Sequence, residues 1–177
     1  MNIPNKLTIG RVLAIPVFIV VLMLGYNFAA AVIFILAAIT DYFDGMLARR
    51  CGLVTNFGKI MDPLADKLLV MAAFVCLVEL GEVVSWMVIV ILSREFIVTG
   101  LRIAAAAQGV VIAAELTGKI KTVLQMIAIP ALILNNWPFC LIGLPFAEIM
   151  LWAAVIMTVI SGVEYIAKNK RFFGGKF

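Results

Sequence analysis

All four aspartates of the 177-residue chain lie between positions 41 and 66. Asp41 and Asp44 are three residues apart and Asp62 and Asp66 are four apart, so each pair would share one face of a helix. Only a short segment separates the pairs, and we expect antiparallel neighbouring helices that carry both pairs at a similar depth. The chain contains no histidine, which excludes imidazole catalysis and His-based zinc sites. Four convergent carboxylates indicate a site for a hard cation that prefers oxygen ligands, Mg²⁺ or Mn²⁺.

The composition places this cluster in a membrane protein. Hydrophobic residues make up 65% of the chain and charged residues 14%, whereas soluble domains are about half apolar and a quarter charged. The excess of apolar side chains must therefore face lipid, and the mean hydropathy of +1.17 agrees. A spanning helix needs about 20 mostly apolar residues. We predict a single all-α membrane domain over residues 1–177, with six transmembrane helices at about 7–25, 28–50, 59–80, 84–107, 118–135 and 144–167.

Basic residues predict the orientation of these helices. They gather at the two chain ends, between the second and third predicted helices, and after the fourth, namely Lys6, Arg11, Arg49, Arg50, Lys59, Lys119, Lys121, Lys168, Lys170, Arg171 and Lys176. The three intervening loops carry no Lys or Arg, only Glu79, Glu82 and Glu148. By the positive-inside rule we expect both termini to be cytoplasmic, and we predict a multi-pass protein of the cell's inner (cytoplasmic) membrane. The net charge of +4 is spread between apolar runs, so we expect no nucleic-acid binding.

Ion pairing is the structural alternative to a metal site. A carboxylate among lipid tails costs at least ~2.5 kcal/mol, and four together also repel one another. Basic neighbours are available, namely Arg49, Arg50, Lys59 and Lys67. They would explain one or two of the acids but not four on one interhelical face, so we favour the metal site.

Small residues flank the aspartates. Gly45 and Ala48 lie one turn beyond the first pair, and Gly58 lies one turn before Asp62. They either let the helices pack closely or leave room for a flat nucleotide to approach the backbone. Packing logic alone leaves both interpretations open.

The whole segment resembles the signature of the CDP-alcohol phosphatidyltransferases. It reads Asp41-Tyr-Phe-Asp44-Gly45-Met-Leu-Ala48-Arg49, eight residues, Gly58, three residues, Asp62, three residues, Asp66. The resemblance implies a homodimeric six-helix fold with two divalent ions, Mg²⁺ or Mn²⁺, held by the four aspartates. It further implies that the cytidine diphosphate of a lipid donor lies against them in a cavity open to the cytosol. Asp66 is then also the candidate base for the acceptor hydroxyl. The implied nucleotide contacts are Asn5, Thr8, Gly45, Ala48, Arg49 and Gly58.

Further motifs resemble the family members that use sn-glycerol 3-phosphate as acceptor. These motifs are Asn2-Ile-Pro-Asn5-Lys-Leu-Thr8 followed by Arg11, Ser93-Arg94-Glu95-Phe96, Thr99-Gly-Leu-Arg102 and Gly118-Lys119-Ile-Lys121-Thr122. The implied reaction joins CDP-diacylglycerol and glycerol 3-phosphate to give phosphatidylglycerol phosphate and CMP.

A phosphate dianion needs cations in its binding cavity. Arg94 and Arg102 are eight residues apart and so lie on similar faces of one helix, and Lys119 and Lys121 open the next helix. We predict that these four side chains bind the acceptor phosphate, since Arg can grip phosphate bidentately and Lys adds a point charge. Pairing of Arg94 with Glu95, and simple membrane flanking for the two lysines, are the structural alternatives.

Two other functions remain open at this point. A different acceptor, such as inositol phosphate, serine or phosphatidylglycerol, would use the same aspartate signature. A divalent-metal transporter would also place acids inside a membrane. However, a transporter would need acids on the far side too, and Glu79, Glu82 and Glu148 are expected there only in loops.

Overall fold

The computed structural model describes the backbone of residues 3–50, 56–107 and 115–169, and the side chains of residues 10, 12–40, 67–106 and 115–169. Six α-helices and one short 3-10 helix run through these ranges: α1 (Ile3–Met23), α2 (Asn27–Arg50), α3 (Asn56–Glu79), α4 (Ser85–Ala107), α5 (Leu116–Ile133), η1 (Phe139–Ile142) and α6 (Phe146–Lys168). The predicted all-α class and the six helices are confirmed.

Helix boundaries agree with the prediction to within four residues. The largest difference is at α1, which begins at Ile3 rather than at residue 7. Pro4 does not delay the helix, because proline is tolerated in a first turn, where its missing N–H has no intrahelical partner. The expectation for the acidic loops was partly wrong: Glu79 is the last residue of α3, and Glu148 lies in the first turn of α6.

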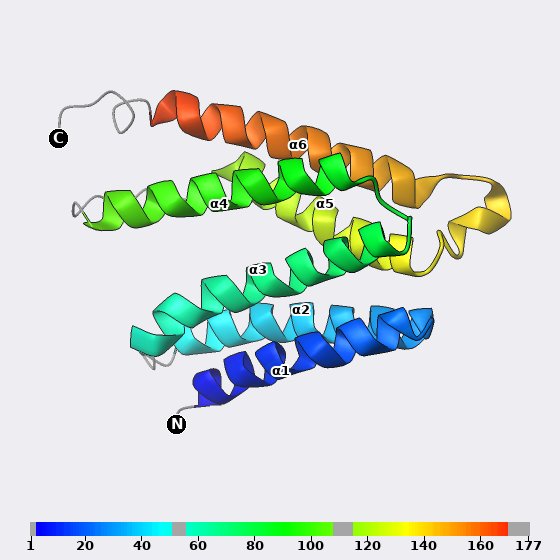
Figure 1. Cartoon of the computed structure of the whole chain (residues 1–177). Helices are drawn as coiled ribbons and strands as arrows, with labels where there is room; N and C mark the ends of the chain where they lie inside the picture. Colours follow the sequence, from blue (N-terminus) through cyan, green and yellow to red (C-terminus); the bar gives the residue numbers. More distant parts are fainter. Residues whose placement is uncertain (1–2, 51–55, 108–114, 170–177) are drawn as a thin grey trace.

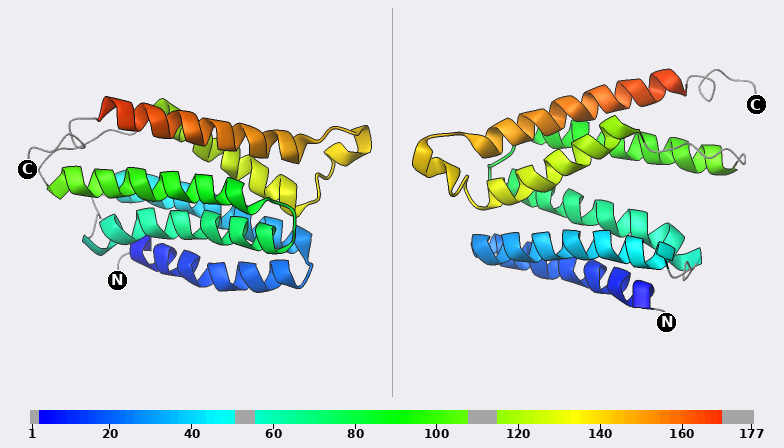
Figure 2. Two further views of the ribbon diagram at one scale, coloured as in Figure 1. Left: turned by 45° about the horizontal axis from the view of Figure 1, so that its top comes forward. Right: turned by 180° about the vertical axis from the view of Figure 1, so that it is seen from behind.

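The helices run alternately up and down the bundle, so the two described chain ends lie at the same end of it (Figure 1). The α1–α2, α3–α4 and α5–α6 connections lie at the opposite end in all views (Figures 1 and 2). Helix α1 packs against α2 and α3, α6 packs against α5 and α4, and α5 also contacts α2 and α3. Helix α5 therefore joins the two halves of the bundle.

Tight helix ends produce these reversals. Gly25 and Gly81 have φ of +82° and +78°, a left-handed conformation that glycine adopts without steric cost. After each glycine, a backbone N–H reaches a carbonyl five residues back, from Tyr26 to Val21 and from Glu82 to Leu77. This is the Schellman pattern, which satisfies the last helical carbonyls. Each chain reversal therefore needs only a few residues.

The bundle is apolar both inside and outside. Its core contains fully buried aromatic residues, among them Phe18, Phe34 and Phe74, and the rings of Phe18 and Phe34 are 5.9 Å apart. Large apolar side chains such as Phe28 and Ile103 are also well exposed. Helices α5 and α6 are each long and apolar enough to cross a membrane. An outer surface of this kind suits contact with lipid rather than water.

Candidate functional site

The backbone places the aspartates as the spacing predicted. Asp41 and Asp44 lie in the last part of α2, and Asp62 and Asp66 lie in the first half of α3. These two helices are in contact and antiparallel, so both pairs belong to the end of the bundle where the chain begins and ends. Their side chains lie outside the described residues. The metal site therefore stays a prediction; the described side chains contain no other group of three potential ligands.

The predicted nucleotide contacts fall in the same part of the chain. Asn5 and Thr8 lie on the first turns of α1, Gly45, Ala48 and Arg49 on the end of α2, and Gly58 on the start of α3. Their side chains are likewise outside the described residues, so their contacts with a nucleotide stay a prediction.

All four predicted phosphate-binding cations line one cavity of about 400 Å³ between α3, α4, α5 and α6. Arg94 and Arg102 come from α4, and Lys119 and Lys121 come from α5. The charged side chains around the cavity are Lys67, Arg94, Arg102, Lys119, Lys121, Glu95 and Glu115. Cations therefore outnumber carboxylates by three, which suits an anionic ligand such as a phosphate ester.

Arg94 is held tightly at this cavity. Its side chain is 13% exposed, and its Nη1 donates to Oε1 of Glu95 over 3.1 Å. Its buried Nε has no hydrogen-bond partner among the described residues. Two glycines make room for it: a Cβ on Gly118 would lie 3.2 Å from Nη2 of Arg94, and a Cβ on Gly162 would lie 3.2 Å from its Cγ. The pairing with Glu95 exists, but it leaves other guanidinium donors for a ligand.

The other three cations reach the cavity in different ways. The guanidinium of Arg102 lies over the ring of buried Tyr165, 5.8 Å from its centroid, a cation–π arrangement that restrains the arginine. Lys119 is exposed. Lys121 is only 3% exposed and donates to Glu95. The cavity thus combines an exposed cation without a described ion pair, Lys119, with cations that are held by neighbouring side chains.

Hydrogen bonds and ion pairs between α5 and α6 hold the start of α5 beside the cavity. Thr117 donates to Glu164 over 2.8 Å, and Lys168 bridges Glu164 and Glu115 at 2.5 and 3.2 Å. These contacts link the first residues of α5 to the last turn of α6. They fix the position of the turn that carries Lys119 and Lys121.

Comparison with known proteins identifies the family. A family model described as CDP-alcohol phosphatidyltransferase matches residues 1–160. This chain belongs to the CDP-alcohol phosphatidyltransferase family. It is therefore an enzyme that transfers a phosphatidyl group, and the transporter alternative is set aside.

Several bacterial relatives match this phosphatidyltransferase over nearly their whole length. It is 49% identical over 183 residues to a protein of Bacillus subtilis, covering 95% of each chain. It is 42% identical over 176 residues to one of Rickettsia bellii, covering 97% of each. It is 39% identical over 178 residues to one of Escherichia coli K12, covering 94% of this chain and 93% of the relative. All three are named CDP-diacylglycerol–glycerol-3-phosphate 3-phosphatidyltransferase.

Sequence reasoning missed part of the cavity of this phosphatidyltransferase. Lys67, Glu95 and Tyr165 line it together with the predicted cations. From the sequence, Lys67, which directly follows Asp66, is suggested only as an ion-pair partner for the aspartates, and Glu95 only as a partner of Arg94 and a member of the Ser93–Phe96 motif. Tyr165 lies on the last helix, and no spacing in the sequence connects it with Arg102.

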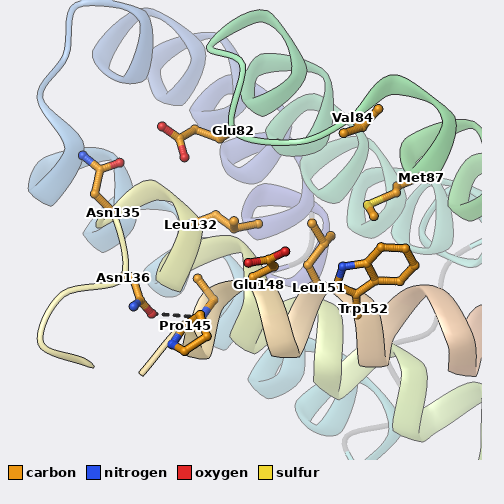
Figure 3. A pocket seen from close by; sticks show the side chains of 11 residues that line it. Glu82, Val84, Met87, Leu132, Asn135, Asn136, Pro145, Glu148, Leu151 and Trp152 are labelled. Carbon is orange, nitrogen blue, oxygen red and sulfur yellow. Dashed lines mark hydrogen bonds between the residues drawn. The ribbon is translucent and has the colours of Figure 1, made fainter. Parts of the chain in front are cut away.

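A second cavity, of about 470 Å³, lies at the opposite end of the bundle (Figure 3). Glu82 and Glu148 line it, and Asn136 bounds it at the α5–α6 connection. Its described lining residues include no Lys or Arg, so it would repel a phosphorylated substrate. The cation-lined cavity is therefore the better candidate for an anionic acceptor, although it is the smaller of the two.

Proposed function

We propose that this enzyme transfers the phosphatidyl group of CDP-diacylglycerol to sn-glycerol 3-phosphate, giving phosphatidylglycerol phosphate and CMP. The assignment of the acceptor rests on one observation: a single cavity is lined by Arg94, Arg102, Lys119 and Lys121. An acceptor without a phosphate, such as serine, would have no use for these cations. The names of the relatives, which match over nearly the full chain, support the same acceptor.

The metal site of this proposal uses Asp41, Asp44, Asp62 and Asp66. Carboxylates are the ligands that Mg²⁺ and Mn²⁺ prefer, and the contact between α2 and α3 puts both aspartate pairs at one end of the bundle. We assign two ions to them, as in the family signature. Bound divalent ions would neutralise the pyrophosphate of the donor and stabilise the departing CMP.

The remaining chemistry belongs to side chains of the protein. An acceptor hydroxyl oxygen attacks the phosphorus that carries the diacylglycerol, the bond from that phosphorus to CMP breaks, and the hydroxyl loses its proton. Asp66 is the proposed base for that proton, and it also orients the hydroxyl. Arg94, Arg102, Lys119 and Lys121 hold the phosphate of the acceptor, so that its attacking hydroxyl faces α3. Holding both reactants in this way lowers the entropic cost of the reaction.

The membrane arrangement is part of the proposal. All six helices span the inner membrane, both termini and the active site face the cytosol, and the enzyme forms a homodimer. The cation-lined cavity supports this orientation, since the last part of α4 and the start of α5 line it, close to the end where the basic residues gather. Cys140 is exposed and belongs to η1 in the α5–α6 connection at the opposite end of the bundle, so it reports on this orientation. In a Cys51→Ser background, a membrane-impermeant thiol reagent should label Cys140 from the extracytoplasmic side only.

A panel of acceptors tests the function. Purified protein with Mg²⁺ and CDP-diacylglycerol is given glycerol 3-phosphate, inositol phosphate, serine or phosphatidylglycerol, and CMP release is measured. We expect rapid release with glycerol 3-phosphate alone. Equal or faster release with serine or phosphatidylglycerol would show that the cation-lined cavity does not select the acceptor.

A further inference from the structure

Glu95 stands at the centre of an ion-pair network that joins three helices. Its Oε2 accepts a hydrogen bond from Nζ of Lys67 on α3 over 2.8 Å. Its Oε1 accepts from Arg94 over 3.1 Å and also from Lys121 on α5. The Glu95 side chain is 14% exposed and that of Lys121 is 3% exposed. The nearly buried Glu95 carboxylate therefore forms ion pairs with three cations.

Lys121 depends on this carboxylate for its position. Among the described side chains, Glu95 is the one ion-pair partner of Lys121. A buried ammonium that loses its partner carries a large desolvation cost, and the flexible four-carbon stem of lysine lets it move toward water instead. Without Glu95, we expect the Lys121 ammonium to leave its place in the cavity.

Lys67 connects the same carboxylate to the aspartate-bearing helix. It follows Asp66 directly on α3 and lines the cation-rich cavity. Through Lys67 and Lys121, Glu95 links α3 to α5 across the cavity at the level of Asp66. Two ammonium groups that both line the cavity are thereby held by the two oxygens of one carboxylate.

We propose that Glu95 is a positioning residue of the acceptor site, and that Lys67 and Lys121, held by it, form two sides of a phosphate subsite. This inference rests on the proposed function for the identity of the acceptor. It adds Lys67 to the proposed phosphate-binding residues. It also means that Glu95, although its negative charge repels phosphate, favours phosphate binding by holding two cations in place.

For Glu95→Gln, a role through net charge alone and a role through positioning predict opposite changes in the affinity for phosphate. The substitution removes one negative charge from the cavity, so attraction alone would tighten the binding of phosphate. If Glu95 acts by positioning, Glu95→Gln instead weakens phosphate binding by about 10-fold or more, because two cations lose their geometry. The sign of the change therefore separates the two roles.

The experiment measures binding and turnover separately. Glycerol 3-phosphate and inorganic phosphate are titrated into purified protein by calorimetry without donor, and the KM of each substrate is measured by CMP release. For Glu95→Gln we expect weaker binding of both phosphates and a higher KM for glycerol 3-phosphate, with the KM for CDP-diacylglycerol changed less than about two-fold. Tighter or unchanged phosphate binding overturns the proposal, as does wild-type protein that binds neither phosphate.

A double substitution tests whether Glu95 acts through Lys121. If it does, Glu95→Gln weakens phosphate binding less in a Lys121→Met background than in the wild type, because one of the two cations that Glu95 holds is already absent. Multiplying effects would show that the two residues act independently and would contradict the mechanism. Glu148→Gln is the matched control, because Glu148 is a glutamate at the opposite end of the bundle that does not line this cavity. It should leave phosphate binding unchanged.

Two outcomes need separate interpretation. If Glu95→Gln does not fold, Glu95→Asp keeps the charge but shortens the reach, and we expect an intermediate weakening; unchanged binding in that variant overturns the proposal. If the wild-type enzyme prefers another acceptor, the proposed function fails, while the titration with inorganic phosphate still decides the role of Glu95.

Discussion

Replacing Arg94 with alanine is expected to raise the KM for glycerol 3-phosphate by about 30- to 150-fold, with little change in the KM for CDP-diacylglycerol. The structure explains why the loss should be large. The side chain is 13% exposed, and its Nε has no partner among the described residues, so the guanidinium offers donors to a ligand in a place with little water.

The magnitude follows from the hydrogen bonds that such a guanidinium can make. A charge-assisted hydrogen bond is worth about 1.5–3 kcal/mol, and a bidentate grip on phosphate makes two of them. Because the cavity is partly solvated, we take the binding free energy lost with the guanidinium as about 2–3 kcal/mol. Each 1.4 kcal/mol corresponds to about ten-fold in affinity. Arg94→Lys keeps the charge but loses the planar fork, so an intermediate increase of about 10-fold is expected.

The protein should tolerate this change. Glu95 keeps two cationic partners, Lys67 and Lys121, after Arg94 is removed, so no buried carboxylate is left unpaired. The assay is CMP release in detergent–lipid micelles, with each substrate varied while the other is saturating, together with thermal unfolding. Equal increases in both KM values, or a loss of stability with an unchanged KM for glycerol 3-phosphate, would show that Arg94 is structural and would refute the reasoning.

Four further predictions follow from the site and the fold. Excess EDTA should abolish CMP release, and added Mg²⁺ or Mn²⁺ should restore it; full turnover in EDTA would remove the proposed metal site. Asp66→Asn should abolish turnover while binding of the donor largely survives, and near-normal turnover would exclude Asp66 as base. Gly118→Ala should raise the KM for glycerol 3-phosphate about 3- to 10-fold, because the new Cβ would lie 3.2 Å from Nη2 of Arg94; an unchanged KM would mean that the arginine adjusts freely. Asn136→Ala should lower the Tm by about 4–8 °C without changing either KM, since it removes two hydrogen bonds of 2.6 and 2.9 Å at the α5–α6 connection; Asn136→Gly, which accepts the positive φ of 62°, separates backbone strain from hydrogen bonding.

The amino-acid sequence was sufficient for the helical elements and for the family. Hydrophobic runs of about 20 residues placed all six helices, and the spacing of the aspartates pointed to the family that the family model confirms. Both signals are local, because they depend on residues within one or two helical turns of each other. Glu148, expected in a loop, lies in the first turn of α6, which begins at Phe146 directly after Pro145; the predicted span of 144–167 had included it, since local patterns place a helix end only to within a residue or two.

What the sequence determined by itself, then, is the helix order, the pairing of acids on two adjacent helices, and the choice of Arg94, Arg102, Lys119 and Lys121 as candidates for the phosphate. Only the tertiary structure decided that these four cations share one cavity and that Glu95 ties Lys67 to Lys121. Those contacts join residues 26 and 28 positions apart. They depend on how each helix is rotated about its axis and packed against its neighbours, which no local pattern of residue types specifies.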